Sequence, residues 1–140
     1  MVKVFIDGSQ GTTGLRLRDR LQERDDIELL DIAEEKRKSV EARLEMVNQA
    51  DVAFLCLPDA ASRELIAAAK DSDTTILDTS TAFRCDDSFA YGFPELGPSF
   101  LENVRTNHRI SVPGCHASGS IAVLMPLVKN GLIAPDEVYT

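Results

Sequence analysis

Short apolar segments alternate with longer amphipathic ones along this chain, which is the pattern expected of strands and helices taken in turn. Runs of β-branched and apolar residues predict buried strands, because a parallel strand covered on both faces needs no polar alternation. They occupy residues 2–7, 27–32, 51–57, 75–78 and 110–112. Apolar residues at helical spacing predict helices over residues 15–25, 34–50, 60–70 and 115–129. Residues 137–140 resemble the start of another strand.

The order of these elements predicts the fold class. Strands that alternate with helices form parallel βαβ units, so we expect an α/β fold with a Rossmann-like, doubly wound, mostly parallel sheet. Residues 79–109 interrupt the alternation with an irregular stretch rich in glycine, proline and aromatic residues, with one helical turn near 99–103. A loop of this length is typical of a functional segment. No linker or repeat divides the chain, so residues 1–140 are expected to form one domain.

Charge and cysteine content narrow the classes of function. The formal net charge of -8 disfavours nucleic acid and anionic membranes and favours a small-molecule partner. No apolar run approaches the roughly 20 residues of a membrane span, and no leader-like segment opens the chain, so we expect a cytoplasmic protein. The three cysteines and two histidines lack ligand spacing, so we expect neither a disulfide framework nor a metal site.

Three glycines spaced three residues apart lie between the first strand and the first helix. Glycine permits a tight turn and lets the backbone approach a pyrophosphate, which the amides and the positive end of the helix then hold. The strand–turn–helix context supports a dinucleotide site, although GxxGxxG is not the commoner GxGxxG spacing. The expected cofactor-binding residues are Gly8, Ser9, Gln10, Gly11, Thr12, Thr13 and Gly14. The alternative is a set of turn and packing glycines.

The residues after the second predicted strand leave the choice of cofactor open. Asp31 stands where an acidic residue binds the ribose hydroxyls of NAD. Lys36, Arg37 and Lys38 follow it and are suited to the 2′-phosphate of NADP, but they equally resemble a solvated start of a helix.

Cys115 lies where a strand gives way to a helix, between Pro113-Gly114 and a run of small polar residues. A helix N-terminus stabilises a thiolate, and its amides can donate to an oxyanion formed on attack. Beside a nicotinamide this favours thioester formation coupled to hydride transfer, with Cys115 as nucleophile. His116 is a poor partner for it, because adjacent helical residues point about 100° apart. Unless one of the two histidines serves, the general acid or base lies beyond Thr140.

Five segments together resemble N-acetyl-γ-glutamyl-phosphate reductase, in its shorter form. They are DGSQGTTG, LCLPDAAS, DTSTAFR, YGFPELGP and VPGCHASG, in this order along the chain. The resemblance implies reduction of N-acetylglutamyl 5-phosphate by NADPH to N-acetylglutamate 5-semialdehyde, a step of arginine biosynthesis, through a thioacyl intermediate on Cys115.

The resemblance also assigns further residues and a larger protein. Pro58 and the Thr79-Ser80 turn lie at strand ends, where the ribose and nicotinamide of the cofactor would run, and Arg37 of the basic triplet is the candidate for the 2′-phosphate. Arg84 is the candidate for anionic groups of the substrate, and a surface or structural arginine is the alternative. NADP is the implied cofactor, and Asp31 keeps NAD open. The family has a second α+β domain for substrate and subunit contacts, which is missing here, so we expect a homo-oligomeric full-length protein and an inactive fragment.

Three other interpretations of the sequence stay open, and one of them is a Rossmann-like domain whose glycine loop binds something other than a dinucleotide. An aspartate-semialdehyde dehydrogenase or a related thioacyl-forming enzyme would share the mechanism. A non-catalytic dinucleotide-binding module would share the fold without the chemistry, and slow alkylation of Cys115 would favour it.

Overall fold

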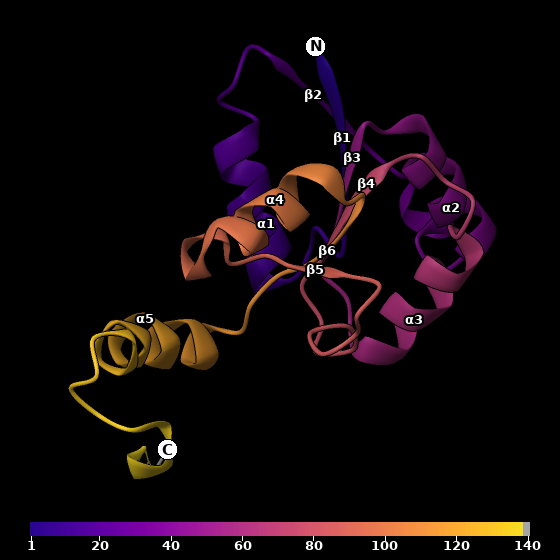
Figure 1. Ribbon diagram of the computed structural model, residues 1–140. Helices are drawn as coiled ribbons and strands as arrows, with labels where there is room; N and C mark the ends of the chain where they lie inside the picture. Colours follow the sequence, from indigo (N-terminus) through magenta and orange to yellow (C-terminus); the bar gives the residue numbers. More distant parts are fainter. Residues whose placement is uncertain (139–140) are drawn as a thin grey trace.

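A six-stranded sheet forms the centre of the computed structural model, which describes residues 1–138 (Figure 1). Its strands are β1 (Val2–Asp7), β2 (Ile27–Leu30), β3 (Val52–Leu55), β4 (Thr75–Asp78), β5 (Ala90–Tyr91) and β6 (Arg109–Ser111). They lie in the order β2-β1-β3-β4-β6-β5, and every pairing is parallel. The expected Rossmann-like sheet is confirmed, and among the described residues it is entirely parallel.

Helices cover both faces of the sheet, as the doubly wound prediction requires. The α-helices are α1 (Thr12–Leu21), α2 (Val40–Gln49), α3 (Asp59–Ala68), α4 (Pro98–Thr106) and α5 (Cys115–Lys129), and the 3-10 helices are η1 (Glu34–Lys36), η2 (Pro94–Leu96) and η3 (Pro135–Glu137). Figure 1 shows α2 and α3 on one side of the sheet and α1 and α4 on the other.

The main hydrophobic core lies between the sheet and the α2–α3 layer. Phe5, Leu55 and Ile76 from the strands meet Val47 of α2 and Leu65 of α3, and all five side chains are almost completely buried. Burial of an aliphatic or aromatic side chain of this size stabilises the fold by roughly 1.5–3 kcal/mol. This core fixes the relative positions of β1, β3 and β4, whose ends carry the predicted site residues.

The register of the sheet brings four strand ends into one row. Asp7 of β1 pairs with Leu55 of β3, Leu55 with Asp78 of β4, and Asp78 with Ser111 of β6. Each strand therefore reaches its carboxyl end at the same level, and the segments that follow these residues emerge at a common edge.

Three segments differ from the sequence-based expectations. The single helix expected over 34–50 is broken, because Ser39 caps a separate α2 by accepting from the amide of Ala42 at 3.2 Å. The loop 79–109 contains β5 and a full helix α4, where one helical turn was expected. The expected strand 137–140 is wrong at its start, since residue 137 ends η3; residues 139–140 lie outside the described residues.

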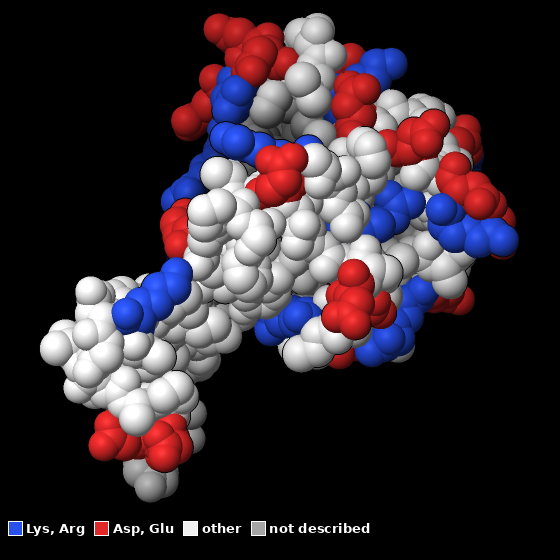
Figure 2. Space-filling model, in the orientation of Figure 1, with Lys and Arg blue, Asp and Glu red and all other residues white. Residues whose placement is uncertain are grey.

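Helix α5 projects away from the sheet (Figure 1). None of its residues, all of which are described, is buried, and the side chain of Val123 is 65% exposed. Figure 2 shows that this lobe is covered almost entirely by uncharged residues, with charge gathered at its ends. An apolar cavity of about 520 Å³ lies between α5 and the η2–α4 segment.

Candidate active site at the carboxyl edge of the sheet

The glycine turn after β1 depends on glycine for reasons of chain packing. Gly8 has a φ of +79°, and a side chain at this position would overlap the carbonyl of Cys56. A side chain at Gly14 would overlap the carbonyl of Gly8. At Gly11 a Cβ would stay 3.4 Å from the nearest atom, so this glycine is not required by the chain itself. The packing alternative thus accounts for two of the three glycines, whereas a Cβ at Gly11 would make only an ordinary van der Waals contact.

The turn leaves an open, uncapped helix terminus. Gly11 is the N-cap of α1, and among the described residues no side chain caps this end and no acidic residue lies in its first turn. A cavity of about 350 Å³ adjoins it, lined by Gly11, Thr12, Thr13, Gly14, Cys56, Leu57 and Thr79. Uncapped amides and two hydroxyls at the positive end of a helix match the needs of a phosphate group. These residues therefore fit the pyrophosphate of a dinucleotide.

The position of this cavity in the sheet supports the same assignment. After β1 the chain passes outward to β2 and then returns to place β3 on the other side of β1. This reversal is a topological switch point, where open α/β sheets bind ligands outside the carboxyl ends of their strands. The cavity lies there, between the turn after β1 and the residues after β3.

Cys56 was missed as a site residue by the sequence analysis, whereas Thr79, which also lines the cavity, belongs to the turn expected beside the cofactor. The apolar run DVAFLCL favoured a core position for Cys56, but its side chain is only half-buried and lines the cavity. Burial nevertheless raises the pKa of the Cys56 thiol, so it stays protonated at neutral pH. Both residues directly follow strand ends, and for Cys56 this placement was the available signal.

Pro58 and Ser80 do not line the cavity. Pro58 is the exposed N-cap of α3. Ser80 is buried, and its hydroxyl donates to the carboxylate of Asp78 at 2.5 Å. Both residues lie at the same edge of the sheet as the cavity. Because neither lines it, their contacts with the cofactor stay predictions.

The carboxylate of Asp31 is already occupied. Arg18 of α1 donates to both of its oxygens, at 2.5 and 2.9 Å. These bonds to Arg18, with a smaller electrostatic contribution from nearby Arg37, lower the pKa of the Asp31 carboxyl. Arg37 itself is half-buried, and its Nε has no hydrogen-bond partner among the described residues. Arg18 and Arg37 therefore both act electrostatically on the Asp31 carboxylate, and Arg18 occupies both of its oxygens.

Cys115 is exposed at the N-terminus of α5, as the sequence predicted. Its N-cap is Gly114, and no side chain among the described residues caps this end. The Sγ atom lies 3.7 Å from Nδ1 of His116, a long contact for a thiol hydrogen bond. The two side chains are therefore within reach of each other, and the role of His116 as a partner of Cys115 stays a prediction.

Arg84 lies next to the Cys115 turn. Its Nε donates to the carbonyl of Val112 at 3.1 Å, and its Nη2 donates to the carbonyl of Thr79 at 3.0 Å. The sequence analysis predicted that Arg84 binds the substrate. In the structure Arg84 contacts the segment that precedes Cys115, and its contact with substrate stays a prediction.

Two parts of the predicted site are therefore at one edge, separated by two strands. The glycine turn follows β1 and Cys115 follows β6, and β3 and β4 lie between them. Strand spacing places these segments roughly 14 Å apart. A dinucleotide held at the glycine turn would extend across β3 and β4 toward Cys115.

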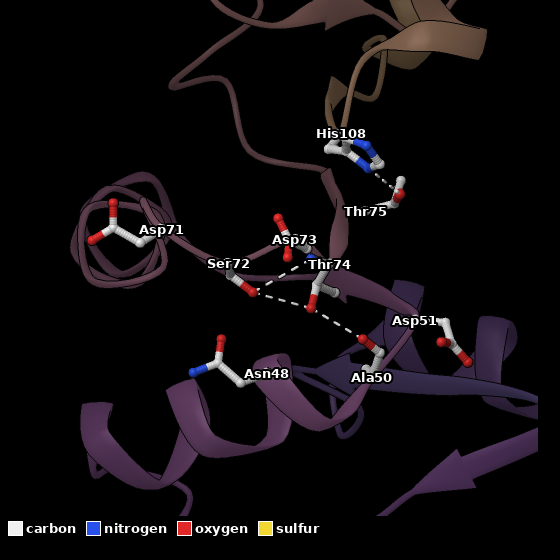
Figure 3. A pocket seen from close by; sticks show the side chains of 9 residues that line it. All are labelled: Asn48, Ala50, Asp51, Asp71, Ser72, Asp73, Thr74, Thr75 and His108. Carbon is white, nitrogen blue, oxygen red and sulfur yellow. Dashed lines mark hydrogen bonds between the residues drawn. The ribbon is translucent and has the colours of Figure 1, made fainter.

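A second cavity lies at the opposite edge and contains none of the predicted residues. Figure 3 shows it between the amino ends of β3 and β4 and the end of α2, lined by Asn48, Ala50, Asp51, Asp71, Ser72, Asp73, Thr74, Thr75 and His108. It is larger, at about 530 Å³, but its hydroxyls are engaged in holding the fold: Thr74 donates to the carbonyls of Val47 and Ala50. The carboxyl edge is the better candidate for chemistry.

Residues 1–138 contain neither a cluster of potential metal ligands nor a helix that could cross a membrane. No group of three or more histidine, cysteine, aspartate or glutamate side chains is arranged to hold a metal ion. No helix in the same part of the chain has the length and apolar character needed to cross a membrane.

Comparison with known families agrees with the fold and the position of the glycine turn. Residues 3–104 match the family described as semialdehyde dehydrogenase, NAD binding domain. The chain belongs to this family. The match includes the glycine turn, β2 and the loop that carries Arg84, and it ends before Cys115.

Curated relatives confirm the resemblance drawn from the five segments. The chain is 49% identical over 138 residues to N-acetyl-gamma-glutamyl-phosphate reductase of Chelativorans sp. (strain BNC1), covering 99% of this chain and 44% of that protein. It is 47% identical over 131 residues to the reductase of the same name from Trichormus variabilis (strain ATCC 29413 / PCC 7937), covering 94% of this chain and 41% of the relative. The chain thus spans less than half the length of these relatives.

Solved structures agree on the fold. Aspartate semialdehyde dehydrogenase II of Vibrio cholerae, complexed with ASA, matches with a TM-score of 0.68 at 20% identity, over 92% of this chain and 47% of that one. The Candida albicans aspartate semialdehyde dehydrogenase with NADP matches with a TM-score of 0.64 at 15% identity, over 93% of this chain and 47% of that one. At these identities the likeness shows the fold alone.

Proposed function

We propose that this chain is the dinucleotide-binding and nucleophile-carrying part of an N-acetyl-γ-glutamyl-phosphate reductase. The observation that carries the proposal is the presence, at one sheet edge, of an uncapped glycine-turn cavity and an exposed cysteine at a second uncapped helix terminus. The names of relatives at 47–49% identity supply the substrate class. The reaction is reduction of N-acetylglutamyl 5-phosphate to N-acetylglutamate 5-semialdehyde with release of phosphate, in the cytoplasm.

In this mechanism Cys115 performs the covalent step. Its thiolate attacks the acyl carbon, the bond from that carbon to the phosphate oxygen breaks, and inorganic phosphate leaves. The amides of the first turn of α5 donate to the oxyanion that forms during attack. A nicotinamide dinucleotide held at the glycine turn would supply the hydride that reduces this thioester, and departure of the aldehyde would restore the thiolate of Cys115. His116 lies close enough to Sγ to exchange a proton with it, and otherwise the general acid belongs to the remaining length of the full protein.

NADP is the proposed cofactor. The ribose of NAD requires a carboxylate that is free to accept its hydroxyls. Both oxygens of Asp31 instead accept from Arg18, and Arg37 adds a second positive charge nearby. This arrangement removes the repulsion that a free carboxylate would exert on a 2′-phosphate and offers guanidinium groups that suit it.

Arg84 is the proposed anchor for an anionic group of the acyl phosphate. Its Nη1 makes no hydrogen bond to another described residue, while its other two nitrogens hold backbone carbonyls. The relatives are more than twice as long as this chain. We assign to their additional residues the second domain, the rest of the substrate pocket and the contacts of a homo-oligomer. The 140-residue chain alone is accordingly proposed to bind cofactor without turning over substrate.

A turnover assay tests the proposal. A form extended to the full length of the relatives is mixed with N-acetylglutamate semialdehyde, phosphate and NADP, and reduced cofactor is followed by its absorbance. We expect turnover that Cys115→Ser abolishes and that Cys85→Ser, which removes the other exposed cysteine, leaves unchanged. Turnover with aspartate semialdehyde alone would transfer the proposal to that substrate, and no turnover with either aldehyde would refute it.

A further inference from the structure

Arg84 joins two segments that leave the sheet at different strands. Its Nη2 holds the carbonyl of Thr79, which follows β4, and its Nε holds the carbonyl of Val112, which follows β6. Its side chain is half-buried between them. A guanidinium has a rigid, planar set of donors, so one side chain can fix the distance between two carbonyl groups.

The third nitrogen of Arg84 packs against Gly114. A Cβ built on Gly114 would lie 2.7 Å from Nη1 and 3.3 Å from Cζ. Flexible side chains usually yield to such a contact, but this guanidinium is held by its two carbonyl partners. Gly114 is the N-cap of α5, so the guanidinium lies directly against the residue before Cys115.

Little else ties this end of α5 to the sheet. The helix buries none of its own residues, all of which lie in the described part. The backbone amide of Val112 donates to the carbonyl of Asp78 at 2.7 Å, and Lys129 at the far end of the helix donates to the carbonyl of Leu96 at 2.9 Å. The direction of the first turn of α5 therefore depends on the segment 112–114, which is the segment that Arg84 holds.

We propose that Arg84 is a positioning residue for Cys115, and that Gly114 is required because the guanidinium occupies the space of its side chain. This inference rests on the proposed role of Cys115 as nucleophile. It is separate from substrate binding, since it acts on the free protein through the carbonyls of Thr79 and Val112.

The test is the rate at which iodoacetamide modifies Cys115, followed by peptide mass spectrometry so that Cys56 and Cys85 are counted separately. The reagent is neutral, so loss of an anion-binding group does not change its attraction to the site, and the effect of a lost positive charge on the thiolate is controlled by Arg84→Lys. We expect Arg84→Ala to slow modification of Cys115 by at least about fivefold, an effect on the scale of one lost hydrogen bond. Arg84→Lys keeps the charge but loses the two-carbonyl fork, and it should not restore the rate.

Arg63→Ala is the matched control. Arg63 is also an arginine that donates to a backbone carbonyl of the same loop, that of Ala82 at 3.0 Å, and it is exposed. Its removal should leave the rate at Cys115 unchanged. Equal rates in Arg84→Ala and the wild-type chain would overturn the proposal, and so would full rescue by Arg84→Lys.

Gly114→Ala gives a second test that does not require Arg84→Ala to fold. It should slow modification in the wild-type background, because the new Cβ displaces the guanidinium, and a normal rate would count against the proposal. In the Arg84→Ala background the same change should have a smaller effect. A different result would show that Cys115 is not an activated nucleophile. In that case Cys115 in the wild-type chain would react no faster than exposed Cys85, and both the role of Cys115 and the positioning role of Arg84 would be refuted.

Discussion

Asp7 and Asp31 are both paired with an arginine, yet their pKa values shift in opposite directions. Asp31 is exposed, so the bonds from Arg18 dominate and lower its pKa. Asp7 is buried at the end of β1, and loss of hydration raises its pKa despite the bond from Arg43 at 2.6 Å. Solvent exposure therefore decides whether the pKa of a paired carboxyl rises or falls. The Arg18–Asp31 pair lies at the surface, where a ligand can reach it, whereas the Arg43–Asp7 pair is buried and stabilises the fold.

Arg18→Ala is expected to reduce the preference for NADP over NAD. The change frees both oxygens of Asp31 to repel a 2′-phosphate or to accept ribose hydroxyls. An exposed ion pair contributes up to about 1 kcal/mol, so we expect the ratio of the two dissociation constants to change by roughly fivefold. Calorimetric titration of the chain with each dinucleotide measures it.

The control for this substitution is Arg24→Ala. Arg24 forms a similar exposed pair with Asp26, at 2.9 and 2.6 Å, but before β2, at the amino edge of the sheet. It should leave the ratio unchanged. A ratio that stays constant in Arg18→Ala would contradict the role given to the Arg18–Asp31 pair.

Arg43→Ala is expected to lower the free energy of unfolding by about 3–5 kcal/mol, because it leaves the carboxylate of Asp7 buried without a partner. The side chains of both residues are less than 10% exposed. Asp7 already has a raised pKa in the folded state, and loss of Arg43 raises it further. A raised carboxyl pKa gives stability that is present at low pH and lost as pH rises. Urea unfolding should therefore show a smaller penalty at pH 4 than at pH 7, and an equal penalty at both would contradict this account.

Elements whose signal is local were predictable from the sequence, and those set by contacts between distant residues were not. β1, β3 and β4 are apolar runs bounded by turn residues, and the sequence placed each within two residues. β5 has two residues and exists through its pairing with β6, so no periodicity could reveal it. Gly97 and Pro98 at the start of α4 are a recognisable signal for the N-terminus of a helix, but the sequence analysis predicted only one turn there.

The candidate site divides in the same way. The glycine turn and Cys115 were predictable, because each joins a strand to a helix within a few residues. The Arg18–Asp31 pair and the contact of Arg84 with Gly114 join residues 13 and 30 positions apart. They depend on which strands are neighbours and on the register between them, and a single sequence does not specify either.

Gly8→Ala tests the glycine turn as an element. A left-handed backbone costs a non-glycine residue roughly 1–2 kcal/mol, and overlap with the carbonyl of Cys56 adds to it, so we expect a loss of at least about 2 kcal/mol in unfolding free energy. Gly119→Ala is the control, since a Cβ there meets nothing within 4 Å and the residue lies inside α5. It should be neutral or stabilise by about 0.5–1 kcal/mol. Equal effects of the two substitutions would contradict the packing described for Gly8.

At the scale of the whole molecule, a six-stranded sheet with a buried core is joined to a helix, α5, that buries none of its residues. The core holds the glycine turn and Cys115 at one edge, while the apolar α5 lobe stays open to solvent (Figure 2). The chain also spans less than half the length of its curated relatives. We infer that the additional length of the full protein covers α5.

Hydrogen exchange tests this inference. Amides of α5 should exchange more slowly in the extended form than in the 140-residue chain, because packing on Val123 and its neighbours suppresses opening of the helix. Amides of β3, already in the core of the chain, should change little. Equal exchange of α5 in both forms would show that another surface receives the remaining length.

Covalent trapping of the acyl group is the most direct test of the central claim, that Cys115 carries the chemistry. The extended form is incubated with N-acetylglutamyl 5-phosphate without cofactor, so that the reaction stops at the thioester, and its peptides are weighed by mass spectrometry. The account predicts that the peptide containing Cys115 gains the mass of the acyl group, with release of phosphate, and that Cys115→Ser prevents both. An acyl group on Cys56 or Cys85, or phosphate release without any adduct, would contradict it.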